Sequence, residues 1–185
     1  MENDTIRRSM WTKAGMTGLE LGLISSVYLF ATMLMEKAGM NAFLSSAITF
    51  VLWAAKFAGC IWLIMKAMKS FAAEHSGADN KDTFRLGMAT AFLSALVFAA
   101  VSFANVAYIS AETFNQQIEA MMQQMAPMMD SNSMNMMDRM LQNMPQITFF
   151  SNLIYCFLYG TVLSAIVSRN IPARDPFADY KPEEQ

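Results

Sequence analysis

Apolar residues along this chain fall into four long blocks that are separated by polar segments. The blocks run over about 14–35, 42–65, 86–109 and 149–167. A helix needs about 20 mostly apolar residues to cross the ~30 Å hydrocarbon core of a bilayer, and each block meets that length. The segments between them lack the period-two alternation of barrel strands. The pattern predicts an all-α polytopic membrane protein, with four transmembrane helices in one domain over residues 1–172.

Composition supports the membrane and argues against other classes. Hydrophobic residues make up 55% of the chain and charged residues only 15%, whereas a soluble domain carries about 25% charged residues. The net charge of −2 argues against nucleic acid as a partner, because binding it requires a basic surface. Cys60 and Cys156 both lie inside apolar blocks, so we expect no disulfide framework.

The first apolar block resembles a signal peptide only at its start, where Arg7, Arg8 and Lys13 precede it. Its apolar run is longer than the hydrophobic region of a signal peptide, and it contains Glu20. We therefore expect a retained transmembrane helix.

Lysines and arginines are distributed unequally between the two sides of the expected membrane. Ten lie in the amino-terminal tail, the second connection and the carboxyl tail, and only Lys37 and Arg139 lie on the opposite side. Basic loops stay in the cytoplasm. Both termini are therefore predicted to be cytoplasmic, in a multi-pass protein of the bacterial inner membrane.

Two charged residues interrupt the first two apolar blocks. The connection between these blocks is centred near residue 38, and Glu20 and Lys56 each lie about 18 residues from that point. At ~1.5 Å rise per residue they reach a similar depth. An unpaired charge at the bilayer centre costs about 2.5–3.5 kcal/mol, so we predict an intramembrane ion pair between Glu20 and Lys56, on the cytoplasmic side of the midplane. Fixing the hairpin register and lining an ion path are both open as its role.

Small residues form a stripe on the first helix, almost opposite Glu20. This arrangement allows close helix packing and predicts that the first helix is central in the bundle. The candidates to fill the stripe are the alanine-rich third helix, the Gly160 edge of the fourth helix, and a second copy of the chain. The packing residues are Gly15, Gly18, Gly22, Ser25, Ser26 and Gly160.

A methionine-rich segment connects the third and fourth apolar blocks. Ten of the 19 methionines fall between residues 119 and 144. Their spacing follows one helix face on each side of Pro127, which predicts an extracytoplasmic insertion of two amphipathic helices over 111–146. Thioethers bind Cu(I), but no histidine or cysteine accompanies them, so we predict no metal site. Adaptable packing against lipid or a partner is the competing role, and its candidate residues are Met121, Met122, Met125, Met137 and Met140.

No catalytic or cofactor motif occurs in the sequence. There is no phosphate-binding loop, no glycine-rich nucleotide fingerprint and no HExxH or CxxC motif. The single histidine, His75, lies in a polar connection and is expected to be a solvated loop residue. The tail over 173–185 is rich in proline and charge and is expected to be flexible, with Phe177 and Tyr180 as possible partner contacts.

The order of these features is similar to that of one bacterial family. Glu20 lies within "GMTGLELGL", a basic connection follows the second helix, a long polar insertion follows the third, and "YGTVLSAIVSRNIPARDPF" closes the fourth. This arrangement resembles the family catalogued as domain of unknown function 4199. The resemblance implies a four-helix inner-membrane protein with no assigned activity.

The leading functional hypothesis is a non-enzymatic inner-membrane protein, without cofactor, that acts as an accessory or assembly partner of another membrane protein in envelope biogenesis. The alternative is a small self-associated transporter or channel that uses the Glu20–Lys56 pair. A third hypothesis is Cu(I) handling by the methionine-rich segment.

Overall fold

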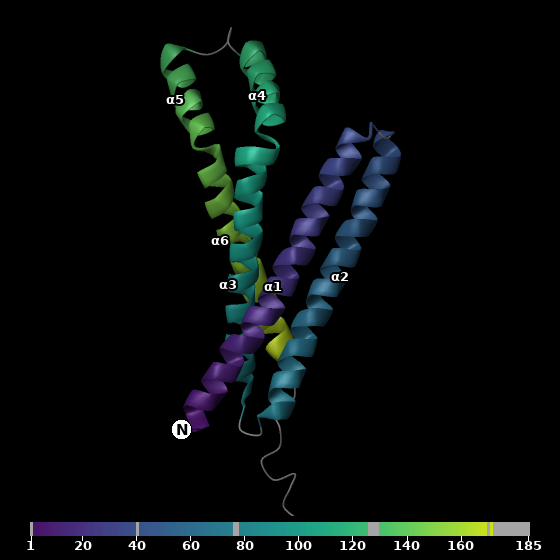
Figure 1. Cartoon of the computed structure of the whole chain (residues 1–185), viewed down its shortest axis with the longest axis vertical. Helices are drawn as coiled ribbons and strands as arrows, with labels where there is room; N and C mark the ends of the chain where they lie inside the picture. Colours follow the sequence, from purple (N-terminus) through teal and green to yellow (C-terminus); the bar gives the residue numbers. More distant parts are fainter. Residues whose placement is uncertain (1, 40, 76–77, 126–129, 170, 172–185) are drawn as a thin grey trace, which may run out of the picture.

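The regular structure of the chain is helical throughout the residues that the computed structural model describes, namely 2–39, 41–75, 78–125, 130–169 and 171. Its elements are α1 (Glu2–Lys37), α2 (Ala42–Glu74), α3 (Asn80–Ala104), the π-helix η1 (Asn105–Ile109), α4 (Ala111–Met125), α5 (Ser131–Gln142) and α6 (Met144–Arg169). In Figure 1 the long helices α1, α2, α3 and α6 form the body of the molecule, and α4 and α5 lie beyond one end.

Four stretches are long and apolar enough to cross a membrane. They lie in α1, α2, α3 with η1, and α6, over Ile6–Met35, Phe43–Glu74, Asn80–Ile109 and Met144–Arg169. The prediction of an all-helical protein with four membrane-spanning helices is confirmed. The chain is therefore a multi-pass membrane protein in contact with lipid.

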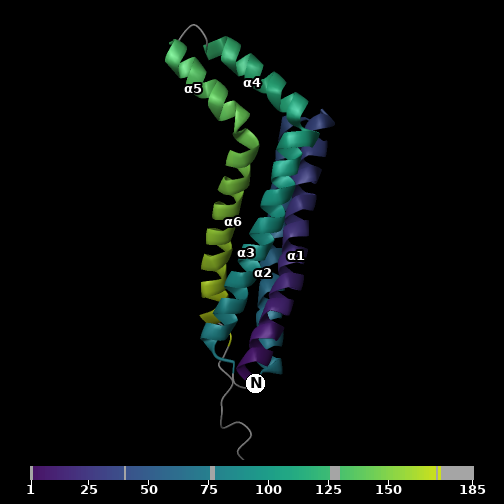
Figure 2. The ribbon, with the colours of Figure 1, turned by 60° about the vertical axis from the view of Figure 1, so that its left-hand side comes forward.

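The central helix is α3, not α1. It packs along both α6 and α1, and Figure 2 shows it between them. Of the 18 most apolar consecutive residues of each span, 39% are buried in α3 and 22% in α1. The prediction of a central first helix was wrong because α3 carries small residues every four positions, at Gly87, Ala91, Ala95 and Ala99, all of them buried. This stripe lets a neighbouring helix approach closely.

The hydrophobic core lies toward the end of the bundle at which the chain begins. All four long helices contribute to it, and its largest fully buried side chains include Phe71, Met68 and Leu86. Toward the other end, the α1–α2 hairpin leans away from α3 and α6 (Figure 1). As a result α2 is poorly covered, and only 6% of its 18 most apolar consecutive residues are buried.

Local signals set the helix ends. Gly39 has φ +61° after α1, a left-handed conformation that favours glycine at a helix end. Asn41 then caps α2 by accepting a hydrogen bond from the Phe43 amide at 3.2 Å. At the start of α3, Asp79 accepts from the Asp82 amide at 2.8 Å in a reciprocal capping box.

A π-helix, η1, ends the long run of α3. Buried Asn105 accepts the Ser110 amide at its backbone oxygen, at 2.7 Å, and the Ser110 hydroxyl at its side-chain oxygen, at 3.2 Å. A π-turn inserts an extra residue and shifts the helix face. The chain leaves it into α4, and α5 leads back into α6 (Figure 1). Both helices of the methionine-rich segment therefore continue past the long helices.

Candidate functional site

A cavity of about 220 Å³ lies inside the bundle and contains Lys56 in its wall. Residues from all four long helices line it, and its polar members are two serines, two cysteines, two tyrosines and the lysine. The complete lining is Leu21, Ser25, Trp53, Lys56, Phe57, Cys60, Ile64, Ala91, Ser94, Phe98, Tyr155, Cys156, Tyr159, Gly160 and Leu163. Most of the wall is apolar, and Lys56 is the one charged group among these lining residues.

The Lys56 ammonium rests on two aromatic rings. Its nitrogen lies 4.7 Å from the centroid of the Tyr28 ring and 5.8 Å from that of Phe98. A desolvated cation–π contact contributes about 2 kcal/mol, which is comparable to the about 2.5–3.5 kcal/mol cost of a charge at the bilayer centre. The rings offset much of that cost. They do not act as conventional acceptors for the three ammonium N–H donors.

Glu20 does not pair with Lys56. The ion pairs among the described residues are Lys13–Glu74 and Arg85–Asp82. Glu20 is exposed on α1, while Lys56 is half-buried in the cavity wall. The predicted intramembrane ion pair is therefore absent between these two described side chains.

The direction of helical side chains explains why Glu20 and Lys56 do not pair. Each Cα–Cβ bond tilts toward the start of its own helix, so side chains at one level of two antiparallel helices lean apart. The contacts that do form between α1 and α2 are offset accordingly, between Tyr28 and Lys56 and between Lys13 and Glu74. By the same offset, the Glu20 side chain would reach the α2 residues at about 64–67. These lie some 12–16 Å along α2 from Lys56.

Lys56 lies near the centre of the expected membrane span. Lys66, an exposed lysine whose ammonium lies 5.1 Å from the centroid of the Trp62 ring, is ten residues away on the same helix. Ten residues correspond to about 15 Å of helix, which is half of the ~30 Å hydrocarbon core. With Lys66 at the membrane boundary, Lys56 is at the midplane.

Aromatic side chains of α2 and α6 surround the outer part of the cavity. The Trp53 ring stacks on Phe57 at 5.6 Å, and Phe57 meets Tyr159 of α6 at 6.2 Å. Tyr155 is 69% exposed and Trp53 48% exposed. The cavity wall thus includes surface residues of both helices, on a side of the bundle that faces lipid.

The predicted packing glycines have different environments. A Cβ on Gly18 would lie 2.9 Å from the Leu93 Cβ, and one on Gly22 would lie 2.6 Å from the Val97 Cβ of α3. A Cβ on Gly160 would lie 2.6 Å from the Ala91 Cβ, whereas one on Gly15 would meet nothing within 4 Å. Gly18, Gly22 and Gly160 therefore lie where α3 comes close, and Gly15 does not.

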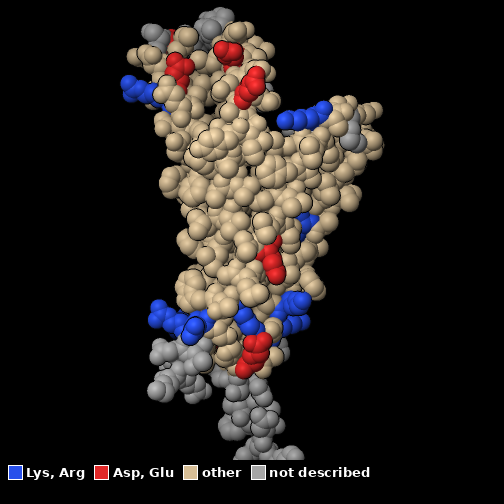
Figure 3. All heavy atoms as spheres, in the orientation of Figure 1, with Lys and Arg blue, Asp and Glu red and all other residues tan. Residues whose placement is uncertain are grey.

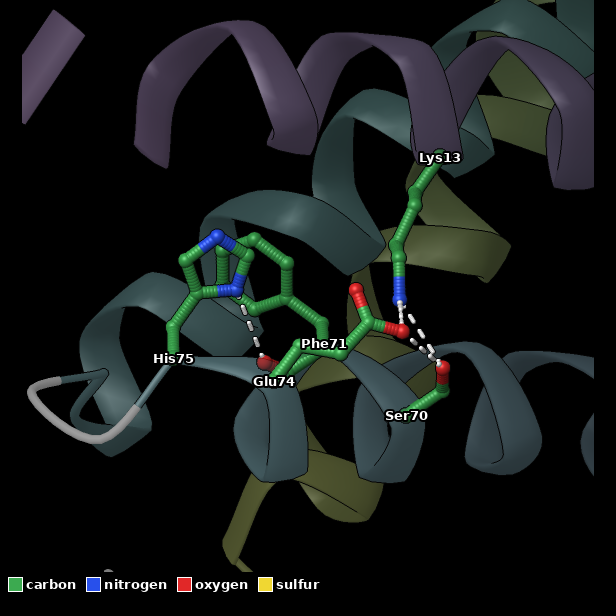
Figure 4. A network of polar contacts seen from close by, with 5 residues as sticks. All are labelled: Lys13, Ser70, Phe71, Glu74 and His75. Carbon is green, nitrogen blue, oxygen red and sulfur yellow. Dashed lines mark hydrogen bonds and ion pairs between the residues drawn. The ribbon is translucent and has the colours of Figure 1, made fainter. Parts of the chain in front are cut away.

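A polar cluster joins α1 to the end of α2 (Figure 4). The Lys13 ammonium donates to the Glu74 carboxylate at 2.6 Å and to the Ser70 hydroxyl at 2.8 Å. The Ser70 hydroxyl also donates to Glu74, at 3.0 Å. This cluster was not predicted from the sequence, although opposite charges at the same end of two adjacent helices were a usable signal.

His75 is not a solvated loop residue. It is half-buried, its ring lies 4.6 Å from that of Phe71, and its Nδ1 lies 3.1 Å from the Phe71 carbonyl oxygen (Figure 4). The histidine therefore packs on the end of α2, where its backbone amide also donates to Phe71.

The methionines of α4 and α5 differ in exposure. Met121, Met136 and Met140 are exposed, and Met122 and Met137 are half-buried. Met125 belongs to α4, but its side chain lies outside the described residues, as do Phe177 and Tyr180 of the tail. Within the described part of the chain, no group of three or more His, Cys, Asp or Glu side chains could hold a metal ion.

The model of a family described as "protein of unknown function (DUF4199)" matches residues 17–169. The chain belongs to this family. The resemblance that the sequence indicated is therefore confirmed, and it covers all four long helices except residues 2–16 of α1. No curated protein and no solved structure matches the chain.

Proposed function

We propose that this DUF4199 protein is a non-enzymatic membrane protein that acts as an accessory or assembly partner of another membrane protein. The observation that carries the proposal is the cavity that contains Lys56, which all four long helices line and which reaches the poorly covered surface of α2. A helix surface that faces only lipid needs no lysine, cysteine or tyrosine groups. A bound protein helix gives them a use, because polar groups stabilise contacts between transmembrane helices.

The proposal includes an orientation and a compartment. Lys and Arg side chains gather at the end of the molecule where α1 begins, as Figure 3 shows in blue. Basic loops face the cytoplasm, so we place both termini there and the methionine-rich helices α4 and α5 outside, in the inner membrane of a bacterium. Envelope biogenesis is the process we propose for the complex.

The transporter alternative rested on a Glu20–Lys56 path. Because the exposed Glu20 side chain leans away from Lys56 and does not line the cavity, the described residues do not join the two in one path. The accessory role does not depend on it.

The direct test is purification of the amino-terminally tagged protein from native membranes after mild cross-linking, followed by mass spectrometry. We expect one membrane protein in stoichiometric amount. Recovery of the chain as a homo-oligomer alone, or as a monomer alone, contradicts the accessory role.

A further inference from the structure

Lys56 has no acidic partner among the described residues, although it lies at the expected centre of the membrane. The described ion pairs both lie elsewhere, and no described hydrogen bond involves its ammonium. A buried charge is stable only when it is paired and hydrogen-bonded. Ionisable residues within membranes accordingly pair with one another or line polar cavities. The rings of Tyr28 and Phe98 hold the ammonium from one side and leave its donors available.

The size of the cavity restricts what can enter it. About 220 Å³ is below the roughly 300–1,000 Å³ of pockets that hold drug-sized ligands. A long amphiphile does not fit inside, whereas one or two protruding side chains do. The exposure of Tyr155 and Trp53 beside the cavity allows a helix to approach from the lipid.

We propose that the cavity receives an aspartate or glutamate side chain from a transmembrane helix of the partner protein, and that this carboxylate pairs with Lys56 at the bilayer midplane. The inference rests on the proposed accessory function and specifies its partner. Charge complementarity selects the acid, because an anion supplies the acceptor that the rings lack. The aromatic residues Trp53, Phe57 and Tyr159 pack against the helix that carries it, and the Ser94 hydroxyl offers a further donor inside the cavity.

The test places a photo-cross-linking amino acid at Tyr155, beside the cavity, in the full-length protein in native membranes. A matched probe at Val27, an equally exposed position of α1, serves as the control. We expect Tyr155 to capture one protein, through a transmembrane segment that contains an aspartate or glutamate near its midpoint. The Val27 probe should not capture that segment.

Substitutions then test the charge. Lys56→Met should reduce the Tyr155 cross-link at least about tenfold, equivalent to about 1.4 kcal/mol, and Lys56→Arg should retain most of it. Lys66→Met removes a lysine of the same helix outside the cavity and should leave the cross-link unchanged. If Lys56→Met does not fold, replacing the partner's acid by its amide should give the same loss with this chain intact.

The outcomes separate the two proposals. An undiminished cross-link in Lys56→Met or in the partner's amide variant, or a captured segment without an acid, overturns the ion pair and leaves the accessory role standing. If the tag purification recovers a stoichiometric partner that does not cross-link at Tyr155, the ion pair is likewise overturned and the accessory role stands. Capture of lipid alone, together with no partner in the tag purification, overturns both.

Discussion

Replacing Gly22 by alanine tests the close approach of α1 to α3. The added Cβ would lie 2.6 Å from the Val97 Cβ and 3.1 Å from the Ser94 backbone oxygen. Carbon atoms pack best at about 3.5–4.0 Å, and neither neighbour is the end of a flexible side chain. The two helices must therefore separate locally by about 1 Å. Overpacking of this kind costs about 1–3 kcal/mol.

Alanine also stabilises a helix relative to glycine, by about 1 kcal/mol, so the substitution needs a matched control. Gly15→Ala makes the same change on the same helix, where a Cβ meets nothing within 4 Å. The difference in unfolding free energy between the two variants isolates the packing cost.

The assay is thermal unfolding in detergent, followed by size-exclusion chromatography of the heated samples. At about 2–4 °C per kcal/mol for a chain of this size, we expect Gly22→Ala to unfold about 2–12 °C below Gly15→Ala. Equal midpoints for the two variants refute the close packing of α1 on α3 at this position.

Three further predictions follow from described contacts. Ser102→Ala should raise the unfolding midpoint, because the Ser102 hydroxyl is buried without a hydrogen-bond partner and such a group costs about 1–3 kcal/mol; a lower midpoint contradicts this. Lys13→Met should lower the unfolding midpoint less in high salt than in low salt, because exposed ion pairs are screened. If the ion pair with Glu74 causes the loss of stability in low salt, the charge-swapped variant Lys13→Glu, Glu74→Lys should recover it. Under mild peroxide, Met136, 76% exposed, should form sulfoxide before Met68, 1% exposed, as measured by peptide mass spectrometry; the reverse order contradicts their placement.

The sequence was sufficient for the number and type of spanning helices because bilayer thickness imposes a length that few other structures need. Which of these helices pack against one another was harder to predict. The glycine stripe of α1 correctly suggested a close helix contact in general terms, but it gave no measure of how α3 compares as a packing surface. That comparison requires the structure, in which Ala91 of α3 meets Gly160 of α6 while the Ser94 backbone meets Gly18 and Gly22 of α1.

The candidate site shows a different limit. Lys56 was identified from the sequence because a charge inside an apolar block is costly, and it lines the cavity. Its assigned partner was wrong because Cα depth was used without the tilt of the side chains, which separates Glu20 from Lys56. The cavity itself depends on Tyr155 and Tyr159 of α6, which are about 100 residues away in the chain and carry no motif.

The π-helix at Asn105 had no usable sequence signal. Its hydrogen bonds to Ser110 involve residues that are equally common in ordinary helix ends. The capping residues Asp79 and Asn41 were readable in principle, because aspartate and asparagine before an apolar run are typical helix starts.

The depth of Lys56 in the bilayer tests the central claim most directly. Spin labels are introduced one at a time at positions 20, 56 and 66, after the only two cysteines, Cys60 and Cys156, are replaced by alanine. Their depth in a bilayer is then measured from collision with oxygen and with a water-soluble relaxant. We predict that the label at 56 lies about 15 Å below the label at 66. The label at 20 should lie between them and closer to 56, because positions 20 and 56 are nearly level and the side chain at 20 tilts toward the start of α1. A label at 56 that is no deeper than the label at 66 would contradict the account.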